Sequence, residues 1–189
     1  KNYENNIGLL LDDIKDNEGL YPIHYCIKFK NVKAINLFIK YNLNFNKFDN
    51  DNDSILHYAI KFKNYDIFNL ILNNIKDINS TNKNGENALH YACNYYHKQM
   101  IVDLIDKNID VNKQEFINGM TSYMHLITSH ENESIYYFID KIDLTIQDIN
   151  GNTILHYIIF EKNYNILTDF IDKIDNFNIT NIKGKTCLH

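Results

Sequence analysis

Apolar residues gather in short runs that come in pairs along the chain, and a polar segment separates each pair from the next. Within a run, the apolar positions recur at the three- and four-residue spacing of a helix that is buried on one face. The second run of each pair shows this spacing most clearly, and these runs cover residues 34–39, 67–72, 100–105, 135–139 and 166–171. The pattern predicts a series of helix–turn–helix units.

The first run of each pair begins at a short sequence centred on a histidine, for example Ile55-Leu56-His57-Tyr58. Successive histidines of this kind are separated by 33, 33, 66 and 33 residues. A constant period of this size is typical of repeat proteins, in which each unit packs only against its neighbours. The histidines concerned are His24, His57, His90, His156 and His189.

Most of the glycines follow the same period. Five of the six are Gly19, Gly85, Gly119, Gly151 and Gly184. The missing position holds Asn52, and asparagine is the residue that, after glycine, best tolerates a left-handed backbone. We therefore predict a turn with positive φ in every repeat, so that replacing Gly151 by valine destabilises the protein. The only proline, Pro22, lies where the first turn of a helix is expected.

Residues 148–156 read D-I-N-G-N-T-I-L-H, and this sequence resembles the D-x-x-G-x-T-P-L-H sequence of ankyrin repeats. The family's following D-V-N triplet is matched by residues 110–112. The resemblance implies an all-α ankyrin-repeat solenoid of helix–turn–helix pairs with β-turn fingers. A tetratricopeptide array has a similar period but lacks this histidine-centred sequence.

The repeats are expected at residues 16–48, 49–81, 82–115, 116–147 and 148–180, with the remnant of a preceding repeat in 1–15 and a truncated repeat in 181–189. The fourth repeat is the divergent one. Met124 takes its histidine position, and one extra residue lies between Asn112 and Gly119. We expect irregularity around residues 113–143, most of all in the loop after Asn112. Neither end resembles a polar capping repeat, so we expect a fragment of a larger protein.

The charge and composition narrow the classes of partner. The net charge is −5 and all 19 basic residues are lysines scattered among acids, which argues against nucleic acid as a partner. The longest apolar runs, residues 9–11 and 157–160, are far shorter than the roughly 20 residues of a membrane helix. Three widely spaced cysteines fit a reducing compartment, so we expect the chain in the cytoplasm or on the cytoplasmic face of a membrane.

No metal, cofactor or catalytic site is predicted. Histidines of adjacent repeats lie roughly 8–10 Å apart, too far to share an ion that each ligand must approach to about 2 Å. The family resemblance implies instead that these histidines hydrogen-bond at the start of the first helix. Residues 49–53 begin like a calcium loop, but Ser54 replaces its glycine and Ile60 its final acid. His125 and His130 are expected at the surface, and Cys26 and Cys93 in the core.

The family resemblance also implies a binding groove lined by the finger tips and the exposed side of each first helix. The corresponding helix positions are Lys28, Phe29, Lys61, Phe62, Asn94, Tyr95, Thr128, Ser129, Phe160 and Glu161, and the finger positions are Ile117, Ile149 and Ile182. These residues predict an aromatic ladder flanked by lysines and a second apolar row on the C-terminal tips. The alternative is that the same side chains pack between repeats.

Two functions follow from the resemblance. The first is a non-catalytic domain that binds a partner protein or peptide. The second is a substrate-recruitment domain of a membrane-bound S-acyltransferase. In four repeats a tyrosine follows the histidine directly, at Tyr25, Tyr58, Tyr91 and Tyr157. This aromatic residue, together with Met124 in the histidine position of the fourth repeat, is similar to the sequence pattern in the ankyrin segments of DHHC palmitoyltransferases. In either case this segment itself is predicted not to be an enzyme.

Overall fold

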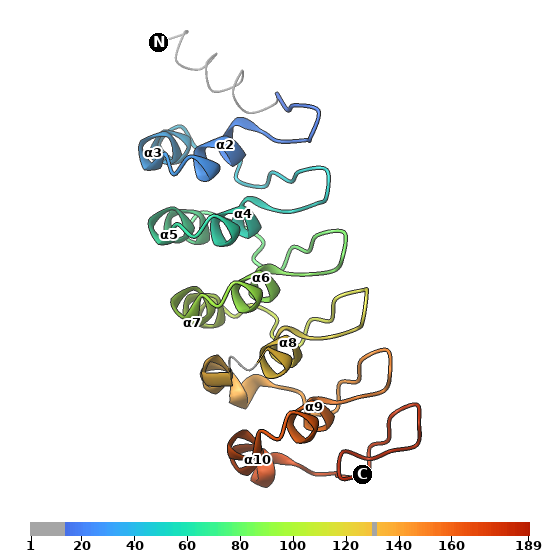
Figure 1. The fold of residues 1–189 in the computed structure, drawn as a ribbon. Coiled ribbons are helices and arrows are strands. Elements are labelled where there is room, and N and C mark those ends of the chain that lie inside the picture. The colour runs from blue at the N-terminus through green and yellow to red at the C-terminus, as the bar shows by residue number, and fades with distance from the viewer. Residues whose placement is uncertain (1–13, 130–131) are drawn as a thin grey trace, which may run out of the picture. The chain divides into compact units, whose positions relative to one another are not determined.

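The computed structural model describes residues 14–129 and 132–189, which belong to two compact units. Unit 1 ends at Lys83 and unit 2 begins at Asn84. The predicted repeat remnant in 1–15 lies almost entirely outside the described residues, as does His130. In each unit, pairs of short helices stack and hairpin fingers project from them to one side (Figure 1).

The predicted helix–turn–helix pairs are present in both units. Unit 1 contains α2 (Pro22–Lys28), α3 (Val32–Lys40), α4 (Ile55–Lys61) and α5 (Tyr65–Leu72). Unit 2 contains α6 (Ala88–Asn94), α7 (Lys98–Asp106), α8 (Ser122–Thr128), η1 (Asn132–Tyr137), η2 (Ile139–Lys141), α9 (Ile154–Phe160), α10 (Tyr164–Phe170) and η3 (Ile171–Lys173). The regular secondary structure of the described residues is helical, and its only β pairing consists of isolated bridges in the fingers.

The core of each unit lies between its stacked helices. The first, or inner, helix of a repeat packs against its own outer helix and against the inner helix of the next repeat, as α2 does with α3 and α4, and α8 with α9. Ile27, Ile60 and Ile127 occupy equivalent inner-helix positions and are fully buried. Each repeat therefore buries one apolar face only when a neighbour covers it, which is the expected energetics of a repeat protein.

The fingers are tight hairpins, and one polar side chain closes those that start at Asp16, Asp49, Glu115, Asp148 and Asn181. In the finger that starts at Asp148, the Oδ1 atom accepts hydrogen bonds from the N–H groups of Asn150 and Asn152, at 2.9 and 2.7 Å. The residue three positions after the acid has positive φ, as predicted: 74° at Gly151 and 63° at Asn52. Asparagine thus fills the slot of a turn glycine because both residues reach the left-handed region at low cost.

Successive fingers within a unit are linked by backbone hydrogen bonds. In unit 1, the N–H of Asn50 donates to Glu18 O at 3.3 Å, and the N–H of Lys83 donates to Asp51 O at 2.9 Å. In unit 2, the N–H of Ile182 donates to Asn150 O at 2.9 Å. These bonds hold the fingers at one register, so their tips form an ordered edge.

The repeated histidines have the structural role that the resemblance implies. Each Nδ1 atom accepts a hydrogen bond from the N–H of the residue three positions earlier, which is the N-cap of the inner helix, with N···N distances of 3.0–3.3 Å for His24, His57, His90 and His156. His189 makes the same bond with Thr186, at 3.1 Å. This bond satisfies a backbone donor that the helix itself leaves unpaired. Burial lowers the pKa of His24, which is fully enclosed.

The fourth repeat departs from the pattern differently from what we predicted. Its finger is only one residue longer than the others. The N–H of Glu115 donates to Met120 O, five positions away. In the fifth repeat the corresponding bond runs from the N–H of Asp148 to Asn152 O, four positions away. Glu115 has one methylene more than aspartate, and its carboxylate accepts from the N–H groups of Ile117, Asn118 and Met120 at 2.6–3.1 Å. The longer side chain therefore closes the longer turn, and the loop after Asn112 stays a regular hairpin.

The real irregularity of this repeat is its outer helix, which is replaced by the 3₁₀ turns η1 and η2. Tyr123 fills a slot that Leu56 and Leu89 occupy in other repeats, and it is fully buried against Phe138, with ring centroids 6.4 Å apart. Its hydroxyl donates to Asp143 O at 3.2 Å. A larger ring inside and a run of aromatic and β-branched residues outside both disfavour a regular α-helix here.

The geometry of the fingers predicts that replacing Gly151 or Gly184 by alanine destabilises the protein to different extents. A Cβ at position 151 would lie 2.9 Å from Asn181 Cα, whereas a Cβ at Gly184 would meet no atom within 4 Å, although φ is positive at both. Gly184→Ala should destabilise by about 1 kcal/mol, from φ strain alone, and Gly151→Ala by roughly 2–3 kcal/mol. Urea unfolding of both variants measures the difference. Equal losses would show that the close approach of the two fingers is unimportant.

The turn between the two helices of a repeat also has positive φ, 55° at Lys30 and 53° at Lys63. A non-glycine residue there costs roughly 1–2 kcal/mol, and glycine loses about 0.5–1 kcal/mol more entropy on folding. Lys63→Gly should therefore stabilise the protein by about 0.5–1 kcal/mol. Lys61→Gly, inside the last turn of α4, is the control and should destabilise by a similar amount. A loss of stability in Lys63→Gly would contradict the assigned turn.

Burial lowers the pKa of both His24 and His125, with the Glu115 carboxylate partly opposing the shift at His125. The unfolded chain then binds more protons than the folded one once the pH falls below about 6.5, the ordinary histidine pKa. The free energy of unfolding should therefore decrease as the pH falls below about 7, where the histidines of the unfolded chain begin to bind protons. His125→Gln, which cannot titrate, should show a shallower decrease in urea unfolding. An unchanged slope would exclude His125 as a contributor.

Candidate functional site

In unit 1, the residues predicted for binding lie at the C-terminal ends of the two inner helices. Lys28 ends α2 and Phe29 is its C-cap, while Lys61 and Phe62 have the same places at the end of α4. Both segments read I-K-F-K-N, at residues 27–31 and 60–64. Phe29 is 72% exposed, whereas Phe62 is half-buried. The two phenylalanines therefore do not contribute equally to an exposed surface.

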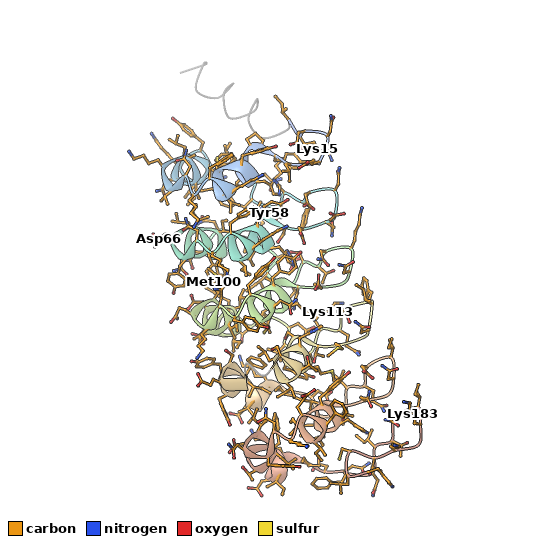
Figure 2. The ribbon with its side chains drawn as sticks, viewed as in Figure 1. Lys15, Tyr58, Asp66, Met100, Lys113 and Lys183 are labelled. Carbon is orange, nitrogen blue, oxygen red and sulfur yellow. The ribbon has the colours of Figure 1, made fainter. Side chains whose placement is uncertain are left out.

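An aromatic pair supports each helix end. The ring of Tyr25 stacks on that of Phe29, with centroids 6.3 Å apart, and the ring of Tyr58 contacts that of Phe62 in a tilted arrangement, with centroids 5.9 Å apart. Tyr58 is also covered by the ring of His24 in an edge contact at 4.7 Å. This second contact explains why Tyr58 is buried and Tyr25 exposed. Tyr58 lies on the side of the helices that faces the fingers, and Asp66 on the opposite side (Figure 2).

Hydrogen bonds to the finger hold these tyrosines in place. The hydroxyl of Tyr25 donates to Asp16 Oδ2 at 2.5 Å, and that of Tyr58 to Asp49 Oδ2 at 2.8 Å. The bond lowers the pKa of Asp16 and raises the pKa of Tyr25. Burial, followed by the bond to Asp49, raises the pKa of Tyr58. Both phenols are therefore neutral at physiological pH, and each ring is fixed at its hydroxyl end.

Lysines flank the exposed rings. Lys28 Nζ lies 6.0 Å from the centroid of the Tyr25 ring, and Lys61 Nζ lies 5.6 Å from that of Tyr58, which is within the range of a cation–π contact. Lys30 and Lys63 follow the phenylalanines directly and are exposed. We call this set the basic–aromatic surface of unit 1: Lys28, Phe29, Lys30, Lys61, Phe62 and Lys63.

The equivalent helix ends of unit 2 carry little charge. Asn94 is exposed and Tyr95 half-buried against Tyr91, and Thr128 and Ser129 are also half-buried. Phe160 at the end of α9 is 79% exposed, and Glu161 beside it is half-buried. The end of α9 thus has its exposed aromatic at the position of Lys28 and Lys61, and it keeps one exposed lysine, Lys162, at the position of Lys30 and Lys63.

The fingers of unit 2 present an apolar row. Ile149 and Ile182 are 60% and 72% exposed, and each donates its backbone N–H to the preceding finger. In the fourth repeat this position belongs to Phe116, not to the predicted Ile117, because Phe116 makes the equivalent bond, to Asn84 O at 2.6 Å. Phe116 is 66% exposed and lies over Gly85. We call Phe116, Ile149 and Ile182 the finger row.

Sequence reasoning missed Phe116 because it placed the extra residue before the turn acid instead of after it. The available signal was Glu115, the only acid near the position where other repeats start their finger with Asp or Asn. The correction moves the start of the fourth repeat from residue 116 to Glu115. Ile117 is exposed as well, but it occupies the inserted position of the turn.

Glutamine side chains brace this edge of unit 2. Gln114 Nε2 donates to Gly119 O in its own finger and to Gln147 O in the next, at 2.6 and 2.8 Å. Gln147 repeats the arrangement with Gly151 O and Thr180 O, at 2.6 and 3.0 Å. The finger row is thus carried by a pre-ordered backbone, which lowers the entropy lost when a partner binds.

The remaining chemistry of the described residues is structural. Burial raises the pKa of Cys26, Cys93 and Cys187, so these thiols remain protonated and unreactive. Residues 14–129 and 132–189 contain no group of three or more metal-ligating side chains. None of the helices in this part of the chain has the length and apolar character needed to cross a membrane.

Comparison with known proteins agrees with this architecture. The family model described as "Ankyrin repeats (3 copies)" matches residues 1–82 and 63–148. No curated protein matches the sequence. Among solved structures, the ankyrin repeat domain of Bcl-3, described as a unique member of the IkappaB protein family, is similar with a TM-score of 0.85 and 15% identity, over 97% of this chain and 86% of that chain.

A second similar structure is that of the Bd0816 predatory endopeptidase from Bdellovibrio bacteriovorus in complex with immunity protein Bd3460. The TM-score is 0.74 and the identity 20%, over 92% of this chain and 90% of that chain. At these identities, both likenesses concern the fold. The period, the finger turns, the histidine caps and the matched family model lead to one conclusion: the chain belongs to the ankyrin-repeat family.

Proposed function

We propose that this chain binds a partner protein through the basic–aromatic surface of unit 1 and the finger row of unit 2. Ankyrin-repeat domains are protein–protein interaction modules, and such modules are non-catalytic in general. The observation that carries the proposal is the exposure of large apolar side chains, at equivalent positions of successive fingers in unit 2 (Phe116 66%, Ile149 60% and Ile182 72%) and at a helix end in unit 1 (Phe29 72%). Exposed aromatic residues of this size are typical anchors of protein interfaces.

Neither surface is required by the fold. The inner helices are stabilised by isoleucines and leucines beneath them and by the histidine caps, while the finger turns are closed by their own carboxylates and backbone bonds. Phe29 contacts Tyr25 on one side and is otherwise open. Binding provides a reason for such residues that stability does not.

The S-acyltransferase hypothesis has no structural support. Its argument rested on the tyrosine after each histidine and on Met124. The hydroxyls of Tyr25, Tyr58 and Tyr157 bind the first carboxylate of their own fingers, and Met124 is fully buried. These residues therefore have roles within the scaffold, and nothing in them points to acyl transfer.

The proposal predicts that Phe29→Ala weakens partner capture without affecting the fold. Immobilised wild-type chain is used to capture proteins from an extract of the source cells, and the captured proteins are identified by mass spectrometry. Because aromatic anchors carry much of an interface's binding energy, Phe29→Ala should lower capture at least about tenfold. Its melting temperature should stay within about 2 °C of wild type, since Phe29 is mostly exposed.

The matched control is Leu37→Ala/Tyr41→Ala. Both residues are large and exposed, 52% and 41%, but Leu37 lies on the outer helix α3 and Tyr41 at its C-cap. Capture by this variant should equal that of wild type. Phe62→Ala is expected to weaken binding and also to lower the free energy of unfolding, by about 1 kcal/mol, because it removes the contact with the Tyr58 ring. Equal capture by wild type and Phe29→Ala would contradict the proposed surface.

A further inference from the structure

The basic–aromatic surface of unit 1 has a charge pattern that unit 2 lacks. Lysines stand on both sides of Phe29 and on both sides of Phe62, so each helix end reads Lys-Phe-Lys. The corresponding segments of unit 2 read N-Y-Y at residues 94–96 and F-E-K at 160–162. A phenylalanine between two lysines therefore occurs at the helix ends of unit 1 and is not a requirement of the repeat.

These lysines form no ion pair with any residue that the structure describes. In the described residues of unit 1, no carboxylate lies within salt-bridge distance of Lys28, Lys30, Lys61 or Lys63, although the exposed acids Glu18 and Asp51 stand on the fingers of the same unit. Lys28 and Lys61 do end their helices favourably, because a cation there complements the helix dipole. That role leaves their charges accessible to a ligand.

Helix stability does not explain why lysine occurs at positions 30 and 63. Both lie beyond the helix end with positive φ, 55° and 53°, where glycine would be easier to accommodate. The same strained lysine occurs in both repeats beside an aromatic ring. Tyr96 and Lys162 have the same positive φ, 56° and 57°, so the backbone conformation belongs to the turn of the repeat. The choice of lysine at this position in unit 1 places a second cation next to each phenylalanine.

Building on the proposed function, we infer that the basic–aromatic surface binds a short acidic segment of the partner, in which two carboxylate side chains about three residues apart enclose apolar residues. Helices α2 and α4 pack directly together, and packed helices lie about 8–10 Å apart. Three residues of a chain in the polyproline II conformation span about 9 Å and return the side chain to the same face. Each carboxylate can thus reach one Lys-Phe-Lys end, while the apolar residues contact the phenylalanines.

A short peptide fits better than a long polyanion. The chain carries a net charge of −5, and the exposed acids Glu18 and Asp51 stand on the fingers of the same unit. This excess of negative charge repels a long polyanion more strongly than a segment with two carboxylates.

The test uses a fluorescein-labelled peptide of sequence Gly-Glu-Leu-Phe-Glu-Gly and its glutamine analogue Gly-Gln-Leu-Phe-Gln-Gly, with binding measured by fluorescence anisotropy at low and high salt. The wild-type chain should bind the glutamate peptide about tenfold more tightly than the analogue, the expected size for several exposed ion pairs. That preference should shrink as salt screens the charges. Equal binding of the two peptides would overturn the inference.

Lys28→Glu/Lys61→Glu should remove the preference for the glutamate peptide. The control variant Lys40→Glu/Lys76→Glu makes the same change in net charge at exposed sites outside the basic–aromatic surface, and Lys40 also lies in the last turn of a helix. This control should retain the preference for the glutamate peptide within about twofold. If the control loses it equally, net charge and not this surface is responsible. Should the reversal variant unfold, Lys30→Gln/Lys63→Gln replaces it, because neutral side chains there leave both helices intact.

A fluorescein-labelled thymidine oligonucleotide of the same length tests whether the surface binds nucleic acid instead. Tighter binding of the oligonucleotide than of the glutamate peptide would overturn the inference in favour of nucleic acid. Partner capture that depends on Phe29, combined with no preference for the glutamate peptide, would reject the acidic segment while leaving the proposed function standing. Equal partner capture by wild type and Phe29→Ala would instead reject the proposed function.

Discussion

The carboxylate or amide that begins each finger is the group on which the rest of a repeat depends. In the second repeat, Asp49 Oδ1 accepts the N–H groups of Asp51 and Asp53, which closes the finger, and its Oδ2 accepts the hydroxyl of Tyr58, which ties the finger to the inner helix. One side chain therefore sets the angle between two elements that would otherwise join through a flexible turn. The order of the finger edge and the position of the aromatic pair both follow from it.

The fourth repeat shows how far this constraint tolerates change. An inserted residue lengthens the finger, and Glu115 keeps the same function because its extra methylene spans the wider turn. Burial raises the pKa of Glu115, but its backbone donors lower it further, so the net shift favours the carboxylate that closes the turn. The outer helix of this repeat is less protected: Tyr123 brings added volume inside, and two 3₁₀ turns take its place.

Because local bonds within the fingers and helix caps stabilise the repeats, their exposed positions are available for recognition. The two units use this freedom differently. Unit 1 places cations around the aromatic rings at its helix ends, whereas unit 2 presents a finger row held by the glutamines Gln114 and Gln147. An ordered backbone beneath exposed side chains is what a binding surface needs, since little further entropy is lost on association.

The sequence by itself determined the repeat, the positive φ at Asn52 and the capping role of the histidines, because each depends on the backbone geometry of a few neighbouring residues. Only the tertiary structure decided that Phe116 and not Ile117 holds the finger position, since that depends on a hydrogen bond to the preceding finger. It also decided that Phe29 is exposed and Phe62 half-buried. Their local sequences are identical, so their difference arises from contacts between repeats, which a repeating sequence does not record.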